Sequence, residues 1–141
     1  MLEKNIGWQF NNTYSKLPKS LLSKIKPVPV KKPEKVLFNV SLSKEIGLNF
    51  SNINNEELSL MFSGNLLPEG SESIAQAYAG HQFGHFTILG DGRAITIGEH
   101  ISKNKNRFDI QFKGSGKTPY SRNGDGRAAL GPMLREYIIS E

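Results

Sequence analysis

A lysine, a loop with four glycines and then a glutamate follow one another within residues 107–136, and their types and order suit the handling of a phosphate group. Lys113 ends a run that alternates apolar and polar residues, which predicts a strand with the lysine on its polar face. A glycine-rich loop follows, and the segment after it, for which we predict a helix, carries Glu136. Anion binding needs exposed N–H groups, positive charge and no bulky side chains. We therefore interpret this stretch as the nucleotide-handling part of an enzyme.

Lys113 and Glu136 are candidates for an ion pair. In protein kinases a strand lysine holds the nucleotide phosphates, and a glutamate on a helix orients that lysine. A half-buried lysine beside phosphate needs an anion that fixes its rotamer and keeps it charged. Glu136 lies off the apolar stripe of the predicted helix, which is formed by Leu130, Met133, Leu134, Tyr137 and Ile138. The spacing permits the pair, and the alternative is a solvated lysine.

The pentapeptide Gly-Asp-Gly-Arg-Ala occurs twice, at residues 90–94 and 124–128. We predict that the first copy is the turn of a hairpin between strands at 86–89 and 94–99, where its two glycines allow positive φ and close backbone approach. The second copy is expected to open the helix, which we predict to begin at Pro132 because proline suits only the first helical turn. The repeat is too short to be the unit of a repeat protein, so we interpret the two copies as separate sites at which the backbone is closely approached.

Established nucleotide motifs do not fit the glycines. Residues 114–118 resemble the end of a P-loop, but Ile110 stands where that pattern requires its first glycine. A histidine pair, His81 and His85, has a spacing that brings two imidazoles to one face of a helix. No third ligand is near, and Gln82 stands where a zinc peptidase has glutamate, so we favour satisfied, partly buried histidines over a metal site.

The patterns around this region predict short strands and helices. We expect an extended segment at 7–20, pinned by Trp8, Phe10 and Tyr14, and an extended proline-rich connector at 27–33. A strand is expected at 36–43 and a loop at 64–73. A short helical turn is expected at 20–26, and a short helix is expected to follow a cap at Ser43. Further helices are expected at 55–62, capped by Asn52 or Asn54, and at 74–82.

Composition indicates a globular protein, because 37% of the 141 residues are hydrophobic and 22% are charged. The absence of cysteine excludes disulfides and thiolate metal sites. No apolar run approaches a membrane span, and the first residues do not fit a signal peptide, so we expect a cytoplasmic protein without membrane contact. Residues 1–40 carry a charge balance of +6, which we interpret as a solvated arm over the fold. Nucleic-acid binding is the less favoured alternative, since interleaved aromatic residues are few.

Two long segments, AGHQFGHFTILGDGRAITIGE (79–99) and DIQFKGSGKTPYSRNGDGRAALGPMLREYIISE (109–141), closely resemble the selenoprotein O family, also known as SelO or YdiU. The segments FNNTYSKLP (10–18), VLFNVSLSKEIGL (36–48) and FSGNLLPEGSESIAQAYAGHQFG (62–84) resemble it as well. The resemblance covers nearly the whole chain. It implies a protein adenylyltransferase that binds ATP in a kinase-like cleft and transfers AMP to Ser, Thr or Tyr hydroxyls of proteins.

The resemblance also assigns roles to residues. Glu136 would orient Lys113, and the ATP contacts would be Gly90, Gly92, Arg93, Lys113, Asp125 and Gly126. The catalytic aspartate and the ligands of Mg²⁺ or Mn²⁺ would belong to later segments of the longer family members. The implied fold class is α+β, a protein-kinase-like N-terminal lobe with a small antiparallel sheet and flanking helices, truncated before the catalytic lobe. We expect a basic extended arm at 1–35 and a partial nucleotide-binding lobe at 36–141.

Three functions remain open from the sequence. The first is the N-terminal part of an adenylyltransferase, inactive by itself. The second is a non-catalytic remnant, or an ATP-binding and interaction module that pairs with a separately encoded C-terminal lobe through an exposed helix stripe. The third, less favoured, is a nucleic-acid-binding module that uses the lysine-rich arm.

Overall fold

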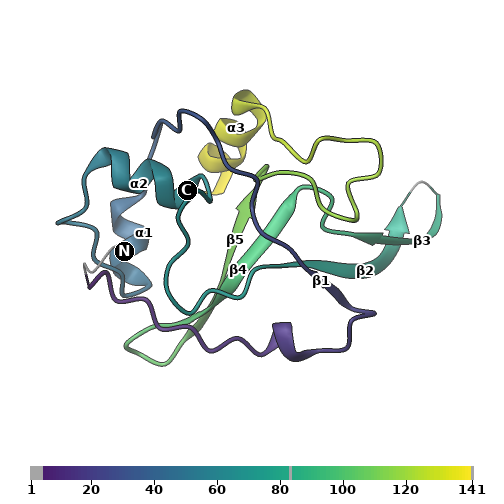
Figure 1. The fold of residues 1–141 in the computed structure, drawn as a ribbon, viewed down its shortest axis with the longest axis horizontal. Helices are drawn as coiled ribbons and strands as arrows, with labels where there is room; N and C mark the ends of the chain where they lie inside the picture. The colour runs from purple at the N-terminus through teal and green to yellow at the C-terminus, as the bar shows by residue number, and fades with distance from the viewer. Residues whose placement is uncertain (1–4, 83, 141) are drawn as a thin grey trace.

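The computed structural model describes residues 5–82 and 84–140 and shows an α+β fold built on one antiparallel sheet (Figure 1). The strands lie in the order β1-β2-β4-β5, and β3 pairs with β2. Two short helices, α1 and α2, lie together at one end of the molecule, and α3 lies beside the end of β5 (Figure 1). The predicted class, a small antiparallel sheet with flanking helices, is confirmed at this level.

Strands β4 (Ala94–Ile101) and β5 (Arg107–Lys113) pair along their whole length, and β5 is the edge strand of the sheet. Burial alternates along β5, with Phe112 buried and Lys113 exposed, as the sequence pattern predicts. Phe112 packs with Ile95 and Ile97 of β4 in one core cluster. This packing fixes the face of β5 on which Lys113 lies.

Strand β2 (Ile74–Gln82) occupies the segment for which we predicted a helix, and that prediction is wrong. Ile74 to Gln76 pair with β1 (Leu22–Lys24), and Ala77 to Gln82 pair with β3 (His85–Gly90). The helical turn predicted at 20–26 is likewise wrong, because β1 lies there. Both segments are short and of mixed pattern, so pairing across the sheet decides their conformation rather than local propensity.

The predicted hairpin at residues 86–99 is also wrong, because β3 and β4 both pair with β2 instead of with each other. Gly90 pairs with Ala77, and Thr96 pairs with Ile74. An advance of six residues from β3 into β4 therefore corresponds to an advance of only three residues along β2. Residues 91–93 are the extra residues, and they form a bulge between two strands that run along the same partner. The hairpin that exists joins β2 to β3 and projects from the sheet (Figure 1).

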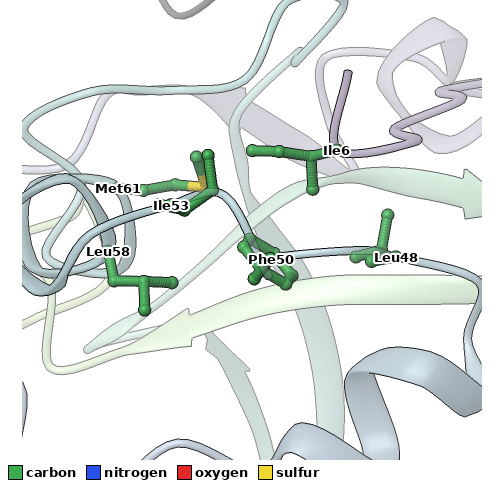
Figure 2. Close-up of a cluster of buried hydrophobic side chains, with 6 residues drawn as sticks. All are labelled: Ile6, Leu48, Phe50, Ile53, Leu58 and Met61. Carbon is green, nitrogen blue, oxygen red and sulfur yellow. The ribbon is translucent and has the colours of Figure 1, made fainter. Parts of the chain in front are cut away.

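Helices α1 (Val40–Glu45) and α2 (Asn55–Phe62) begin at asparagine caps. Asn54 forms the capping box of α2, which confirms one of the two predicted caps. The strand predicted at 36–43 is wrong: Asn39 caps α1, and Ser43 lies inside this helix, where its hydroxyl bonds Val40 O. Helix α2 contributes Leu58 and Met61 to a second apolar cluster, whose other members are Ile6, Leu48, Phe50 and Ile53 (Figure 2). The Asn39 side chain accepts the N–H of Leu42 and thereby favours a helix start over the strand.

The N-terminal segment is extended and packs on the sheet, as predicted for residues 7–20, apart from one 3₁₀ turn at Tyr14–Lys16. Trp8 stacks on Phe10, with ring centroids 5.3 Å apart. The buried carboxylate of Glu99 accepts hydrogen bonds from Thr13 and Tyr14 and forms an ion pair with Arg107. Burial alone raises the pKa of Glu99, but the Tyr14 and Thr13 hydrogen bonds and the Arg107 charge outweigh it, so the pKa is lowered. An ionised Glu99 thus joins this segment to β4 and β5.

The connector at 27–33 and the segment 64–73 contain no helix or strand, as the sequence predicts. Helix α3 (Leu130–Ser140) begins two residues before Pro132, so the predicted start at the proline is wrong by half a turn. Proline lies within the first turn, where it costs no hydrogen bond. None of the helices within residues 5–82 and 84–140 is long and apolar enough to cross a membrane.

Candidate functional site

A cleft of about 650 Å³ lies between the β2–β3 hairpin, the bulge at 91–93 and the loop 114–128. The structure brings all six predicted nucleotide contacts to its wall: Gly90, Gly92, Arg93, Lys113, Asp125 and Gly126. These residues come from chain segments separated by up to 36 positions in the sequence. The fold therefore gathers the two copies of the repeated pentapeptide and the strand lysine around one space.

Lys113 and Glu136 form an ion pair at the edge of this cleft. Lys113 Nζ lies 2.8 Å from Glu136 Oε1 and 2.7 Å from Oε2. The hydrogen bond from Lys113 is the main cause that lowers the pKa of Glu136, and the charges of Lys113, Arg93 and Arg135 add to it. Both side chains are about half exposed, so the pair contributes little to stability. It instead holds the lysine in one direction above the end of β5.

The first Gly-Asp-Gly-Arg segment is locked to β2 by its aspartate. Asp91 N–H donates to Gln76 O at 2.9 Å, and Gln76 N–H donates to Asp91 Oδ2 at 2.9 Å. Burial raises the pKa of Asp91, and the Gln76 hydrogen bond opposes this only in part. The Asp91 carboxylate accepts the Gln76 N–H in place of a backbone carbonyl from a neighbouring strand. Asp91 thereby fixes the conformation of residues 91–93, and Gly92 and Arg93 lie at the wall of the cleft.

The close approach predicted for the glycines of this first segment is found, but the positive φ is not. Neither Gly90 nor Gly92 is among the glycines with positive φ. A Cβ atom on Gly90 would lie 2.4 Å from the ring of Tyr120, and one on Gly92 would lie 3.0 Å from Tyr120 O. Both positions require glycine because residues 118–121 pack directly against the bulge.

The second Gly-Asp-Gly-Arg segment lies in a loop that returns to the end of β5. Gly126 is buried with φ +71°, and a Cβ atom there would lie 2.0 Å from Gly116 O. Asp125 is exposed and accepts the N–H of Arg127 at 2.9 Å. Gly114 N–H, at the start of the loop, donates to Arg93 O at 2.6 Å, which joins the two segments.

Sequence reasoning missed several residues of the cleft. Its wall also includes Arg122 and Arg127, the two arginines of the glycine-rich loop, and Tyr120 and Ser121, which directly precede Arg122. With Arg93 and Lys113 this gives four cations against Asp91 and Asp125 among the described lining residues. The excess of positive charge suits a polyanion, and the arginines that flank the second Gly-Asp-Gly were the signal that could have indicated it.

The histidines do not form a metal site. His81 pairs with Phe86 and His85 pairs with Gln82, so the two lie in adjacent pairs of a hairpin and point to opposite faces. Both side chains are exposed, which corrects the expectation of partial burial. In the described parts of the chain, no group of three or more His, Cys, Asp or Glu residues is placed to hold a metal ion.

Comparison with known proteins gives a consistent result. The family model described as "Protein adenylyltransferase SelO" matches residues 4–141. A protein named "Protein nucleotidyltransferase YdiU" from Pelagibacter ubique is 69% identical over 136 residues, which is 96% of this chain and 28% of that protein. Proteins of the same name are 63% identical in Nitrosococcus oceani, over 100% of this chain and 29% of theirs, and 61% identical in Brevibacillus brevis, over 96% and 28%. The chain thus spans less than a third of the length of these relatives.

Proposed function

The chain belongs to the SelO family of protein adenylyltransferases, and from this premise we propose that it forms one wall of an ATP site. The complete protein transfers AMP from ATP to Ser, Thr or Tyr hydroxyls of other proteins in the cytoplasm. The names of the relatives support a nucleotidyltransferase. The nucleotide, the acceptor and the compartment belong to the proposal.

The observation that carries the proposal is the Lys113–Glu136 pair at the edge of a cationic cleft. A lysine on a strand, oriented by a carboxylate on a helix, is the arrangement with which protein kinases hold nucleotide phosphates. The small antiparallel sheet that carries Lys113 supports a protein-kinase-like lobe. Gly92 and Arg93 approach the same space from the bulge, and Asp125 and Gly126 approach it from the loop.

These groups act on the phosphates during the transfer. An acceptor hydroxyl oxygen bonds to the α-phosphorus, the bond to the bridging oxygen breaks, and pyrophosphate leaves with the electron pair. Lys113 and Arg93 neutralise the negative charge that develops on the phosphate oxygens. The hydroxyl proton passes to a base that lies outside the described residues. Glu136 contributes by keeping Lys113 in position and touches no reacting atom.

The residues described here do not fit the divalent cation that such transfers use. Asp91 is bound to Gln76, and the described part of the chain holds no cluster of acidic or imidazole side chains near Asp125. Ligands for Mg²⁺ or Mn²⁺ therefore come from other segments of the complete protein, or from a separately encoded lobe.

A second candidate is an ATP-binding module that acts as half of a split enzyme. The exposed apolar side chains of α3 favour it, since Ile138 is 70% exposed and Ile139 is 81% exposed. In both candidates, residues 1–141 by themselves bind nucleotide and do not transfer AMP.

The test compares label from the α-phosphate and from the γ-phosphate of ATP in the complete natural protein. We expect α-label on acceptor proteins, lost on Lys113→Ala and reduced by about one to two orders of magnitude on Glu136→Gln, as for loss of one charge-assisted contact. Lys117→Ala is the matched control, because Lys117 is exposed on the same loop and does not line the cleft. Transfer of γ-label, or full activity of the Lys113→Ala protein, would contradict the proposal.

A further inference from the structure

We infer that Thr118 and Ser121 are positioning residues of the nucleotide site, whose hydroxyls orient two backbone N–H groups toward a phosphate. Thr118 Oγ1 donates to Asp91 O at 2.6 Å, and Ser121 Oγ donates to Gly92 O at 2.5 Å. Two successive carbonyls of the bulge are therefore held by two hydroxyls from one turn of the loop. The inference rests on the proposed function and names the groups that shape its phosphate contact.

Other hydrogen bonds of the same turn hold these two hydroxyls in place. Thr118 N–H donates to Ser121 Oγ at 2.7 Å, and Tyr120 N–H donates to Thr118 Oγ1 at 3.1 Å. A backbone carbonyl can only accept, so each hydroxyl donates its proton to the bulge while its oxygen accepts an N–H of the turn. Thr118 is only 4% exposed, and water does not compete for this contact.

The consequence for the bulge follows from the planar trans peptide. In such a unit the N–H points opposite to the C=O. When Asp91 O and Gly92 O face the turn at residues 118–121, the N–H groups of Gly92 and Arg93 point away from that turn. Neither N–H has a hydrogen-bond partner within residues 5–82 and 84–140. Two successive, unpaired N–H groups at the wall of a cationic cleft are a site for phosphate oxygens.

Tyr120 anchors this turn to the sheet independently of any ligand. Its ring packs on Gly90, and its hydroxyl lies 3.0 Å from Ser23 Oγ of β1. The turn is therefore fixed to the sheet by Tyr120 and to the bulge by Thr118 and Ser121. This arrangement holds the phosphate contact in place before nucleotide binds, which lowers the cost of ordering it.

The experiment removes one hydroxyl at a time from the complete natural protein and measures the affinity for ATP and for adenosine by calorimetry. Thr118→Val and Ser121→Ala are expected to weaken ATP binding about tenfold each, since each loosens a charge-assisted contact. Adenosine affinity is expected to stay unchanged, because adenosine has no phosphate. Thr118→Ser and Ser121→Thr keep the hydroxyl and should stay within about threefold of the natural protein.

Ser71→Ala is the matched control, because Ser71 Oγ also donates to a backbone carbonyl, Pro68 O at 2.6 Å, in a loop outside the cleft. It should lower the melting temperature to a similar extent and leave ATP affinity unchanged. An equal loss of ATP and adenosine affinity would overturn the inference, as would unchanged ATP affinity in folded Thr118→Val and Ser121→Ala proteins. If the natural protein binds no ATP, the proposed function itself fails.

Discussion

The two Gly-Asp-Gly-Arg-Ala segments have the same sequence and different structures. In the first, residues 90–94, the aspartate is buried and acts as a strand partner for Gln76. In the second, residues 124–128, the aspartate is exposed and caps a local turn at Arg127. The first interrupts a sheet and the second lies in a loop before α3. Identical residues therefore bring different groups to the cleft.

The glycines differ in the same way. Gly90 and Gly92 have ordinary φ angles and leave room for residues 118–121. Gly126 needs its positive φ and also leaves room for Gly116 O. In both segments the partner is the loop 114–128, which packs against the first and contains the second. The comparison shows that this loop, more than the repeated pentapeptide, organises the cleft.

The largest expected effect is that of Gly126→Ala. The substitution combines a positive φ with a backbone clash, so we expect it to lower the free energy of unfolding by about 3 kcal/mol or more. Gly124→Ala is the control in the same segment, because a Cβ atom there would lie 3.2 Å from Ser121 O, and we expect a loss below about 1 kcal/mol. Chemical denaturation measures both. Equal losses would show that Gly126 has no special role.

Gly90→Ala should have the next largest effect. Its Cβ atom would overlap the Tyr120 ring, so we expect a loss of about 2 kcal/mol from overpacking. Tyr120→Ala removes the ring and should make the added methyl at position 90 nearly neutral. A double-mutant cycle measures this coupling. Additive losses would mean that another contact, and not the ring, excludes a side chain there.

Asp91→Ala and Asp125→Ala compare the two aspartates directly. Asp91→Ala leaves Gln76 N–H without its acceptor, and we expect a loss of about 1.5 kcal/mol. Asp125→Ala should change stability by less than about 0.5 kcal/mol, because the side chain is exposed. Thermal unfolding of both variants checks the difference. If the order were reversed, the assignment of Asp91 to the framework would be wrong.

The smallest expected effect is on the pH dependence of stability. Burial raises the pKa of Asp91 above 3.8, so the folded state holds this proton more strongly than the unfolded state does. The stabilising contribution is complete below pH 3.8 and is lost as the pH rises through the folded pKa. The stability of the natural protein relative to Asp91→Asn should therefore fall as the pH rises above 3.8 through the raised pKa of the folded state. A difference that increases with pH would contradict a raised pKa.

Local patterns predicted the elements whose signals are strong and complete. The alternation of residues 107–113 predicted β5 and the face of Lys113, and the asparagine cap predicted α2. The segment 74–82 was assigned to the wrong class because its three alanines favour a helix, whereas pairing with three partner strands decides its conformation. The prediction of a hairpin at 86–99 was wrong for a related reason. The two glycines do mark a break between two strands, but the break is a bulge and not a hairpin turn.

In the candidate site, too, some residues could be predicted from the sequence and others could not. The residue types of Lys113, Glu136 and the two Gly-Asp-Gly-Arg segments indicated phosphate chemistry from the sequence alone. Thr118, Tyr120 and Ser121 gave no signal, because hydroxyl residues in a loop are common and their importance depends on which carbonyls they meet. Such contacts join positions about 30 residues apart, which no local pattern encodes.

The sequence by itself determined the chemistry available in residues 107–136: a strand lysine, a flexible glycine-rich loop and a carboxylate on the next helix. Side-chain type and periodicity are properties of the chain, so they can be read without coordinates. Only the tertiary structure decided that the two pentapeptides line one cleft, that Asp91 belongs to the framework and that Tyr120 requires Gly90. These facts depend on strand pairing and close packing between distant segments, and both are fixed only when the whole sheet forms.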